Sequence, residues 1–357
     1  MSQPSVFFSL VVPVYNRPDE LRELLESVRQ QSFRDFEVWV VEDGSTIPSQ
    51  HLIQEFAQEF PLYYLPIPNS KQGFARNAGM RRAHGKYLLT VDSDVLLPEN
   101  FFENLHRTLL HEDWDAFGGP DRGREDFTFF QKLTAFTMQA TFTTGGIRGQ
   151  LQDKSKFQLR GFNMGLKATV FHASGGFRDP NQGEDIELSI RLKNAGFRVG
   201  LIPEAFVYHR RRSTFTGFLR QCYSFGINRV NVSRYHPGAI QGVHLFPLFF
   251  AFYMLLLSAS LPLGHLFGWP VHPQVQGLAF LPLGLWMLMG IGEGLWRERQ
   301  SKRGALGLGA FLAPFVGICQ LTAYGIGIAY GLLALRLPFL PSPFTVPLPE
   351  RSAESGS

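Results

Sequence analysis

Charged residues are almost absent from the last third of this chain. Between Val243 and Trp296 the only Asp, Glu, Lys or Arg is Glu293, and the stretch from Gly304 to Leu335 has none. A helix that crosses a bilayer needs about 20 predominantly apolar residues. Three spans meet this requirement, at about 243–267, 277–296 and 308–335. Burial as core helices is the alternative, but three such runs in succession favour an all-α transmembrane region at 243–337.

The loops next to these spans predict which side of the membrane the rest of the chain occupies. Loop 268–276 has no Lys or Arg, whereas the second span is followed by Arg297, Arg299, Lys302 and Arg303. Because basic loops stay in the cytoplasm, we expect an inner-membrane protein whose first domain is cytoplasmic. The N-terminus fits this expectation, since it lacks the basic region of a signal peptide. The Pro- and Ser-rich tail at 338–357 is expected to lie outside and to be disordered.

The composition of the whole chain is that of a globular protein. It is 45% hydrophobic and 18% charged, which excludes a disordered chain or a collagen-like repeat. The two cysteines, Cys222 and Cys319, fall in different regions and favour neither a disulfide scaffold nor a zinc site. A net charge of +4 is too small to indicate nucleic acid as a partner.

Strands and helices alternate in the first half of the soluble region. Apolar runs predict strands at 6–14, 38–41, 62–67 and 87–91. Leu21, Leu24, Leu25 and Val28 recur at the spacing of one helix face behind Pro18. Similar patterns predict helices around 52–60, at 73–83 and from Pro98 onward, and a later strand is expected at 198–208. This rhythm predicts an α/β fold with a doubly wound sheet.

Acidic residues stand at the ends of two of these strands. Asp43 ends the second strand, and Asp92 and Asp94 follow the fourth. Ligands of doubly wound sheets bind beyond the carboxyl ends of the strands, where carboxylates can share Mg²⁺ or Mn²⁺ with a diphosphate. The alternative is that these residues only cap the next helix or turn. For Asp43 both interpretations stay open, whereas for Asp92 and Asp94 we favour the metal.

Several short motifs occur together in a fixed order. They are Ser9-Leu-Val-Val-Pro-Val-Tyr-Asn-Arg, Val40-Val-Glu-Asp-Gly-Ser-Thr, Gly73-Phe-Ala-Arg-Asn-Ala-Gly, Leu89-Thr-Val-Asp-Ser-Asp, Arg160-Gly-Phe-Asn-Met-Gly, Gly175-Gly-Phe and Gly183-Glu-Asp-Ile-Glu-Leu-Ser-Ile-Arg-Leu. Over about residues 7–212 the chain thereby resembles the family-2 glycosyltransferases of GT-A fold. The resemblance implies a Rossmann-like, mixed and mostly parallel sheet with helices on both faces. One departure is Glu42, where the family usually has a first Asp.

The resemblance also implies a role for individual residues. Donor binding would fall to Pro13, Tyr15 and Asn16 around the nucleotide, Asp43 on the nucleobase, Arg76 on the nucleotide or sugar, and Asp92 on ribose or sugar. Asp94 would ligate Mg²⁺ or Mn²⁺ on the diphosphate, with Asp92 and His209 as further contacts of the metal or diphosphate. Asp185 would be the general base, with Glu184 beside it.

Structural alternatives exist for several of these residues. Arg76 could simply pair with a carboxylate on its helix surface, and Tyr15 could belong to the core. Glu184 and Asp185 could be the acidic first turn of a helix, where the helix dipole favours carboxylates. His209 could be a surface residue. The arginines that follow it at 210–212 could bind the diphosphate or anionic lipid headgroups, or could serve only as a topology signal.

Two further segments carry many aromatic residues. Residues 128–147 predict either an interfacial helix that guides a lipid acceptor or a helix packed on the catalytic domain, and we favour the packed helix. Residues 213–242 predict an amphipathic connector at the membrane surface. Processive members of the superfamily carry Gln-x-x-Arg-Trp near this point, but the sequence here is Arg220-Gln-Cys-Tyr-Ser-Phe-Gly. We therefore expect a non-processive enzyme.

Together these features predict an inverting, metal-dependent glycosyltransferase with its catalytic domain at 1–212. It would move a sugar from a nucleotide-diphosphate donor to a hydroxyl of a glycan or lipid-linked saccharide, in contact with membrane lipids, during assembly of a cell-surface glycan. One alternative is a polyprenyl-phosphate glycosyltransferase, whose acceptor phosphate needs no general base. Another is a catalytically silent membrane partner of a glycan synthase or export complex.

Overall fold

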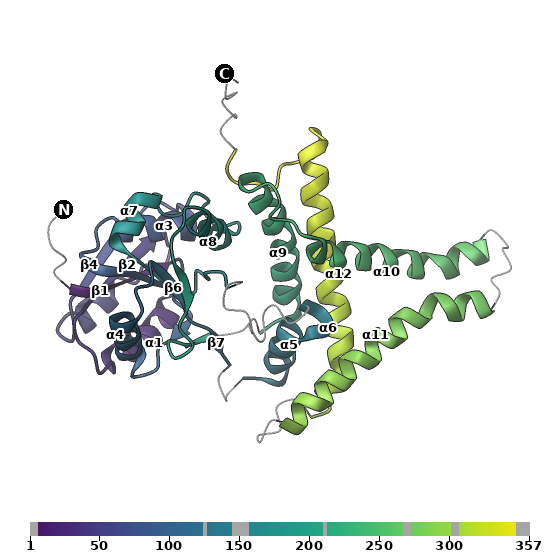
Figure 1. Ribbon diagram of the computed structural model, residues 1–357, viewed down its shortest axis with the longest axis horizontal. Helices are drawn as coiled ribbons and strands as arrows, with labels where there is room; N and C mark the ends of the chain where they lie inside the picture. The colour runs from purple at the N-terminus through teal and green to yellow at the C-terminus, as the bar shows by residue number, and fades with distance from the viewer. Residues whose placement is uncertain are drawn as a thin grey trace. The chain divides into compact units, whose positions relative to one another are not determined.

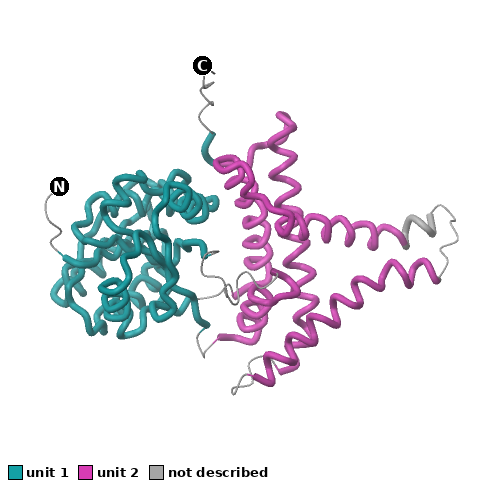
Figure 2. Tube along the Cα trace, viewed as in Figure 1, with its two compact units in different colours: residues 1–124, 153–210, 345–357 teal, residues 125–152, 211–344 magenta. Residues whose placement is uncertain are grey.

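The computed structural model describes residues 6–123, 127–144, 157–209, 213–266, 273–300 and 307–347. The chain forms two compact units (Figure 2). The first contains residues 1–124, 153–210 and 345–357, and the second contains 125–152 and 211–344. The chain therefore passes from the first unit into the second and back before it enters the long helices.

A seven-stranded sheet forms the centre of the first unit, in the order β3-β2-β1-β4-β8-β6-β9. Its strands are β1 (Val6–Val14), β2 (Phe36–Asp43), β3 (Leu62–Ile67), β4 (Gly85–Val91), β6 (Ala116–Gly118), β8 (Asn163–Lys167) and β9 (Val199–Leu201). All neighbours pair in parallel except at β8, which is antiparallel to both β4 and β6. The sheet is therefore mixed and mostly parallel, and the four strands predicted at its start are confirmed.

Helices cover both faces of this sheet (Figure 1). They are α1 (Pro18–Arg29), α2 (Gln50–Phe56), α3 (Lys71–Met80), α4 (Phe101–His111), α7 (Ala168–Ser174) and α8 (Glu184–Asn194). Alternate residues of β1 point to opposite faces. Phe8, Leu10 and Val12 pack in one buried cluster with α1, α2 and α4. Val11 faces α3, where a Cβ added to Gly79 would lie only 2.5 Å from its side chain.

A small second sheet corrects one prediction. The strand expected at 198–208 is split into β9 in the large sheet and β10 (Val207–His209) in a three-stranded sheet with β5 (Val95–Leu96) and β7 (Asp121–Arg122). Pro203 lies between the two strands and has no N–H to donate to a ladder, so a single strand could not continue through it. The split places His209 opposite Val95 in an antiparallel pair.

The second unit contains only helices and connecting segments among its described residues. It contains α5 (Phe129–Gln139), α6 (Thr141–Thr144), α9 (Phe215–Tyr235), α10 (Gly242–Leu266), α11 (Pro273–Gln300) and α12 (Gly309–Arg336). The apolar side chains of α5 form one buried cluster with those of α9 and α12. This helix belongs to the second unit, whereas the sequence favoured a helix packed on the catalytic domain. Small residues let α9 and α12 approach closely, since a Cβ on Gly327 would lie 2.1 Å from the carbonyl of Tyr223.

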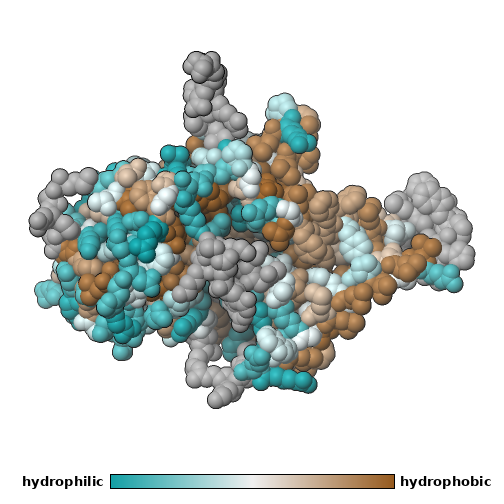
Figure 3. All heavy atoms as spheres, in the orientation of Figure 1, coloured by the Kyte–Doolittle hydropathy of each residue, from teal (hydrophilic) through white to brown (hydrophobic). Residues whose placement is uncertain are grey.

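Three of these helices, α10, α11 and α12, are long and apolar enough to cross a membrane. Large apolar side chains are exposed along these helices, including those of Phe249, Phe252, Leu285, Leu288 and Phe315. Figure 3 shows the helices with a largely hydrophobic, brown surface. Exposure of so large an apolar surface to water is unfavourable in free energy, whereas exposure to lipid is not. The helices therefore indicate a membrane protein. Lys302, Arg303, most of loop 268–276 and the tail beyond residue 347 lie outside the described residues.

Candidate active site

The carboxyl edge of the large sheet gathers most of the expected site residues. The chain order of β1, β2 and β3 runs outward on one side, and β4 lies on the other side of β1, so the order reverses between β1 and β4. Such a switch point leaves a crevice at the strand ends. Tyr15 and Asn16 follow β1 there, Asp43 ends β2, and Asp92 follows β4. Pro13 is the last residue but one of β1 and pairs with Val41 of β2.

Asn16 holds the loops after β1 and β2 together. Its Oδ1 accepts hydrogen bonds from the backbone N–H groups of Thr46 at 2.8 Å and Ile47 at 3.0 Å. Its φ of 54° is left-handed, a conformation that Asn tolerates better than most residues. Tyr15 beside it is 50% exposed, which excludes a place in the core. The tyrosine ring is therefore exposed at this edge of the sheet.

The adjacent carboxylates of Glu42 and Asp43 are both buried, and each accepts hydrogen bonds from a different loop. Glu42 accepts from the backbone N–H of Ser49 at 2.7 Å and from the Tyr64 hydroxyl at 3.2 Å. Burial, followed by the Glu42 charge, raises the pKa of that tyrosine to about 12. Asp43 accepts from the backbone N–H of Ser70 at 2.6 Å, and Ser70 is the residue that precedes α3. Both carboxylates thus fix the loops that surround the expected nucleobase position.

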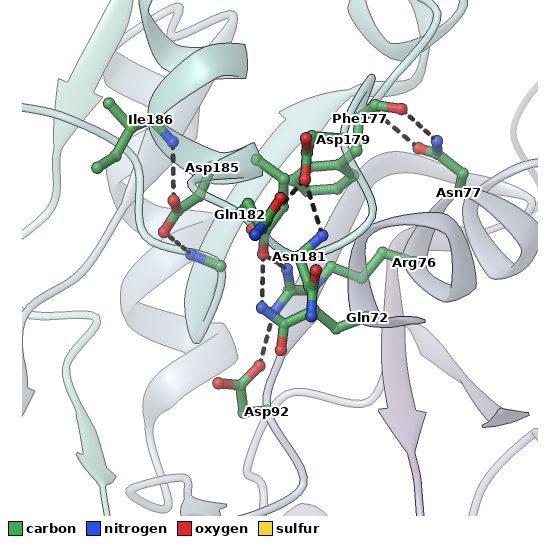
Figure 4. A network of polar contacts seen from close by, with 12 residues as sticks. Gln72, Arg76, Asn77, Asp92, Phe177, Asp179, Asn181, Gln182, Asp185 and Ile186 are labelled. Carbon is green, nitrogen blue, oxygen red and sulfur yellow. Dashed lines mark hydrogen bonds and ion pairs between the residues drawn. The ribbon is translucent and has the colours of Figure 1, made fainter. Parts of the chain in front are cut away.

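Arg76 from α3 forms the centre of a buried charge network (Figure 4). Its side chain is 1% exposed, with Nη2 2.7 Å from Asp92 Oδ1 and Nη1 2.8 Å from Glu184 Oε1. Gln72, one helical turn earlier, donates to the same oxygen of Glu184 at 2.7 Å. The pairing considered from the sequence therefore exists, but it is buried and joins two site carboxylates instead of lying on a helix surface.

Glu184 and Asp185 open α8 but differ in their surroundings. Burial, and next the charge of Asp185, raise the pKa of Glu184 to about 7, although the Arg76 guanidinium opposes the change. Asp185 is less buried, and its Oδ2 accepts from the backbone N–H of Gly161 at 3.0 Å. Gly183 before them has a φ of 79°, so the helix begins at a backbone conformation suited to glycine. Both carboxylates also lie where the helix dipole favours negative charge.

Asp92, Asp94 and His209 form a cluster whose potential ligand atoms all lie within 4.8 Å of one another. Asp94 Oδ1 is 3.3 Å from His209 Nε2, and Asp94 Oδ2 is 2.6 Å from Arg17 Nη1. Burial opposes ionisation of Asp94, but His209 and the Arg17 guanidinium hold its pKa well below the usual range. Two carboxylates with one imidazole are a suitable donor set for Mn²⁺ or, less strictly, Mg²⁺. The residues present therefore fit a divalent cation.

Three residues of this site were not singled out from the sequence. Arg17 contacts Asp94, Gln72 contacts Glu184, and the backbone of Gly161 contacts Asp185. A Cβ on Gly161 would lie 2.6 Å from Arg76 Nη1, so glycine is needed for the close approach of this loop. Arg17 and Gly161 both belong to the quoted motifs, which was the available signal. The arginines at 210–212 lie outside the described residues.

The mostly parallel doubly wound sheet with acidic groups at its switch point agrees with a GT-A fold, and the similarity to a solved structure supports this class. The structure is similar to a mannosyltransferase from Pyrobaculum calidifontis that was solved in complex with GDP-Man and Mn²⁺, with a TM-score of 0.55 at 16% identity over 93% of this chain and 89% of that one. The model of glycosyl transferase family 2 matches residues 9–178.

Two curated relatives extend this comparison. A glycosyltransferase, GlyG, of Streptococcus pneumoniae is 32% identical over 219 residues, which are 58% of this chain and 72% of that protein. A succinoglycan biosynthesis protein, ExoA, of Rhizobium meliloti is 24% identical over 80% of this chain and 84% of its own length. The chain belongs to glycosyl transferase family 2.

Proposed function

We propose that this protein is an inverting, metal-dependent glycosyltransferase that uses a nucleotide-diphosphate sugar and a hydroxyl acceptor, most simply a lipid-linked saccharide. The proposal rests on one observation, the proximity of two groups of residues. The Asp92–Asp94–His209 cluster and the Arg76–Glu184–Asp185 network share one edge of the sheet, and Arg76 connects them through Asp92. The first group suits a diphosphate with its cation, and the second suits the sugar and the acceptor.

Different residues would contact the nucleotide and the cation. Asn16, Asp43 and Tyr15 shape the nucleotide pocket, Asp92, Asp94 and His209 would hold the cation, and Arg17 adds a positive charge beside Asp94. When bound, the cation would neutralise the diphosphate and so improve the leaving group. Arg76, fixed by two carboxylates, keeps the Asp92 carboxylate in place beneath the donor.

Asp185 is the better candidate for the general base. Glu184 is buried against Arg76 and Gln72, and its raised pKa keeps a proton on part of the population at neutral pH. Asp185 is partly exposed and can therefore reach an acceptor from the solvent side. In a single displacement, Asp185 would remove the hydroxyl proton while the oxygen attacks the anomeric carbon from the face opposite the diphosphate, which inverts the configuration.

The comparisons support a role in glycan assembly, since one relative is named for succinoglycan biosynthesis and the fold neighbour holds a nucleotide sugar with Mn²⁺. The basic residues Arg297 and Arg299 at the end of α11 support a cytoplasmic catalytic unit, where nucleotide sugars are available.

The test is a binding measurement on the full-length chain in detergent with UDP-, GDP- and TDP-sugars, first with Mn²⁺ and then with EDTA. Metal-dependent binding of one nucleotide class is expected. Folded protein that binds no nucleotide sugar under either condition would refute the proposal and favour a silent membrane partner.

A further inference from the structure

The helical unit contains a cavity of about 520 Å³, a volume typical of small-molecule sites. All six helices of this unit contribute to its walls, including the three long enough to cross a membrane. Most of the walls are apolar, with Phe142, Phe225, Phe246, Trp286, Met289 and Leu321 among the lining residues. An apolar chamber inside candidate membrane helices is more accessible to a lipid than to a water-soluble metabolite.

A few polar groups interrupt these apolar walls. Arg229 from α9, His244 from α10 and Gln320 from α12 line the cavity, whereas none of its described lining residues is acidic. The nearby carboxylate of Glu293 is already used, because it accepts from the backbone N–H groups of Thr141 and Phe142 and from Arg297. The cavity therefore carries a positive charge that no lining side chain balances.

Two of these polar side chains have a buried atom without a hydrogen-bond partner among the described residues. Gln320 is 8% exposed, and neither its Oε1 nor the buried Nε of Arg229 has a hydrogen-bond partner among the described residues. His244 Nδ1 accepts from the backbone N–H of Gln241 at 3.0 Å, which leaves the ring proton on Nε2 as a donor. Buried polar groups are costly without partners. Two donors, an acceptor and an unbalanced charge therefore point to a missing polar ligand with negative charge.

We propose that this cavity binds the phosphorylated head and the first part of the chain of an acceptor lipid. Arg229 and His244 would donate to phosphate or diphosphate oxygens, and Gln320 Oε1 would accept from a hydroxyl of the same molecule. The aromatic walls would contact the apolar chain. This assignment rests on the proposed function, because it supplies the lipid to which the acceptor sugar is attached.

Calorimetric titration of the full-length chain in detergent with farnesyl diphosphate tests the proposal. Farnesol, inorganic diphosphate and a short-chain phosphatidic acid serve as comparison ligands, which separate the contributions of chain, head and ordinary phospholipid. Saturable binding of farnesyl diphosphate, tighter than that of each comparison ligand, is expected. Equal binding of phosphatidic acid would make the cavity a general phospholipid site and refute the assignment to the acceptor.

Two variants and one control sharpen the result. Arg229→Gln should weaken farnesyl diphosphate binding at least about tenfold, as loss of a charged hydrogen-bond donor does, while farnesol binding changes little. Val243→Phe, at a partly exposed lining position, should weaken both ligands by filling space. Arg220→Gln removes an exposed arginine of the same helix that does not line the cavity, and should change neither.

Nucleotide-sugar binding is measured on the same preparations. Intact nucleotide-sugar binding without any farnesyl diphosphate binding would refute this inference alone. Farnesyl diphosphate binding without nucleotide-sugar binding would leave the lipid site in place and refute the proposed function.

Discussion

Arg76 and Glu184 form an ion pair in which both side chains are almost completely buried, with 2.8 Å between Nη1 and Oε1. Because the second fork of the guanidinium reaches Asp92, this one residue connects α3, the end of β4 and the start of α8. The side chain that we propose for donor binding should therefore also contribute to the stability of the domain.

Removal of the Arg76 charge should destabilise the sheet domain. Breaking a buried ion pair typically costs about 3–5 kcal/mol, because the partner charge is left buried and unpaired. Arg76→Gln is thus expected to lower the midpoint of thermal unfolding of the full chain in detergent. Arg76→Lys should restore only part of the loss, since one ammonium cannot reproduce the planar fork.

The matched control is Arg22→Gln, which removes an arginine whose ion pair with Glu55 is exposed. Exposed pairs contribute at most about 1 kcal/mol. If both variants unfold at the same temperature, the Arg76 network does not stabilise the domain.

Asp94 and His209 should govern the affinity for a divalent cation. Asp94→Asn removes an anionic ligand, and His209→Ala removes the imidazole that the β5–β10 pairing holds beside it. Each variant should weaken Mn²⁺ binding, measured by electron paramagnetic resonance of free Mn²⁺, and reduce metal-dependent donor binding. Asp113→Asn, at a mostly exposed carboxylate outside the cluster, should leave Mn²⁺ binding unchanged. Unchanged Mn²⁺ affinity in both site variants would place the metal elsewhere.

Asp185 and Glu184 should separate catalysis from positioning. Asp185→Asn is expected to lower turnover by about 10²–10⁴-fold, the usual contribution of a general base, while the donor dissociation constant stays unchanged. Glu184→Gln removes a partner of Arg76 and should weaken donor binding more than turnover. Normal turnover of a folded Asp185→Asn variant would instead favour an acceptor that is already ionised, such as a polyprenyl phosphate.

The raised pKa of Glu184 predicts how stability depends on pH. Between its ordinary value of 4.5 and about 7, the folded state binds this proton more tightly than the unfolded state does. The contribution to the free energy of unfolding is therefore complete below about 4.5 and is lost as pH rises through about 7. Glu184→Gln cannot ionise, so the difference in unfolding midpoint between wild type and variant should shift in favour of the variant from pH 5 to pH 8. Parallel pH profiles would show that Glu184 does not titrate in this range.

Local patterns in the sequence predicted the order of strands and helices, the sheet class and the three long apolar helices. Such patterns succeed because burial of one face imposes a period of two on a strand and of 3.6 on a helix. The observed strand Leu62–Ile67 has the predicted bounds, and the Asp92–Asp94 motif lies at the strand end where a ligand was expected. The family resemblance came from the same local strings.

Contacts between distant segments were decided only by the tertiary structure. His209 lies beside Asp94 because β10 pairs with β5, a register that no local period encodes. Arg76 is buried between two carboxylates because α3 and α8 converge on the end of β4. The same packing buries Glu184 and leaves Asp185 partly exposed. The sequence alone therefore determined which elements form and which residue types carry the chemistry. The packing of those elements decided which charges meet, because burial and distance set the energy of each pair.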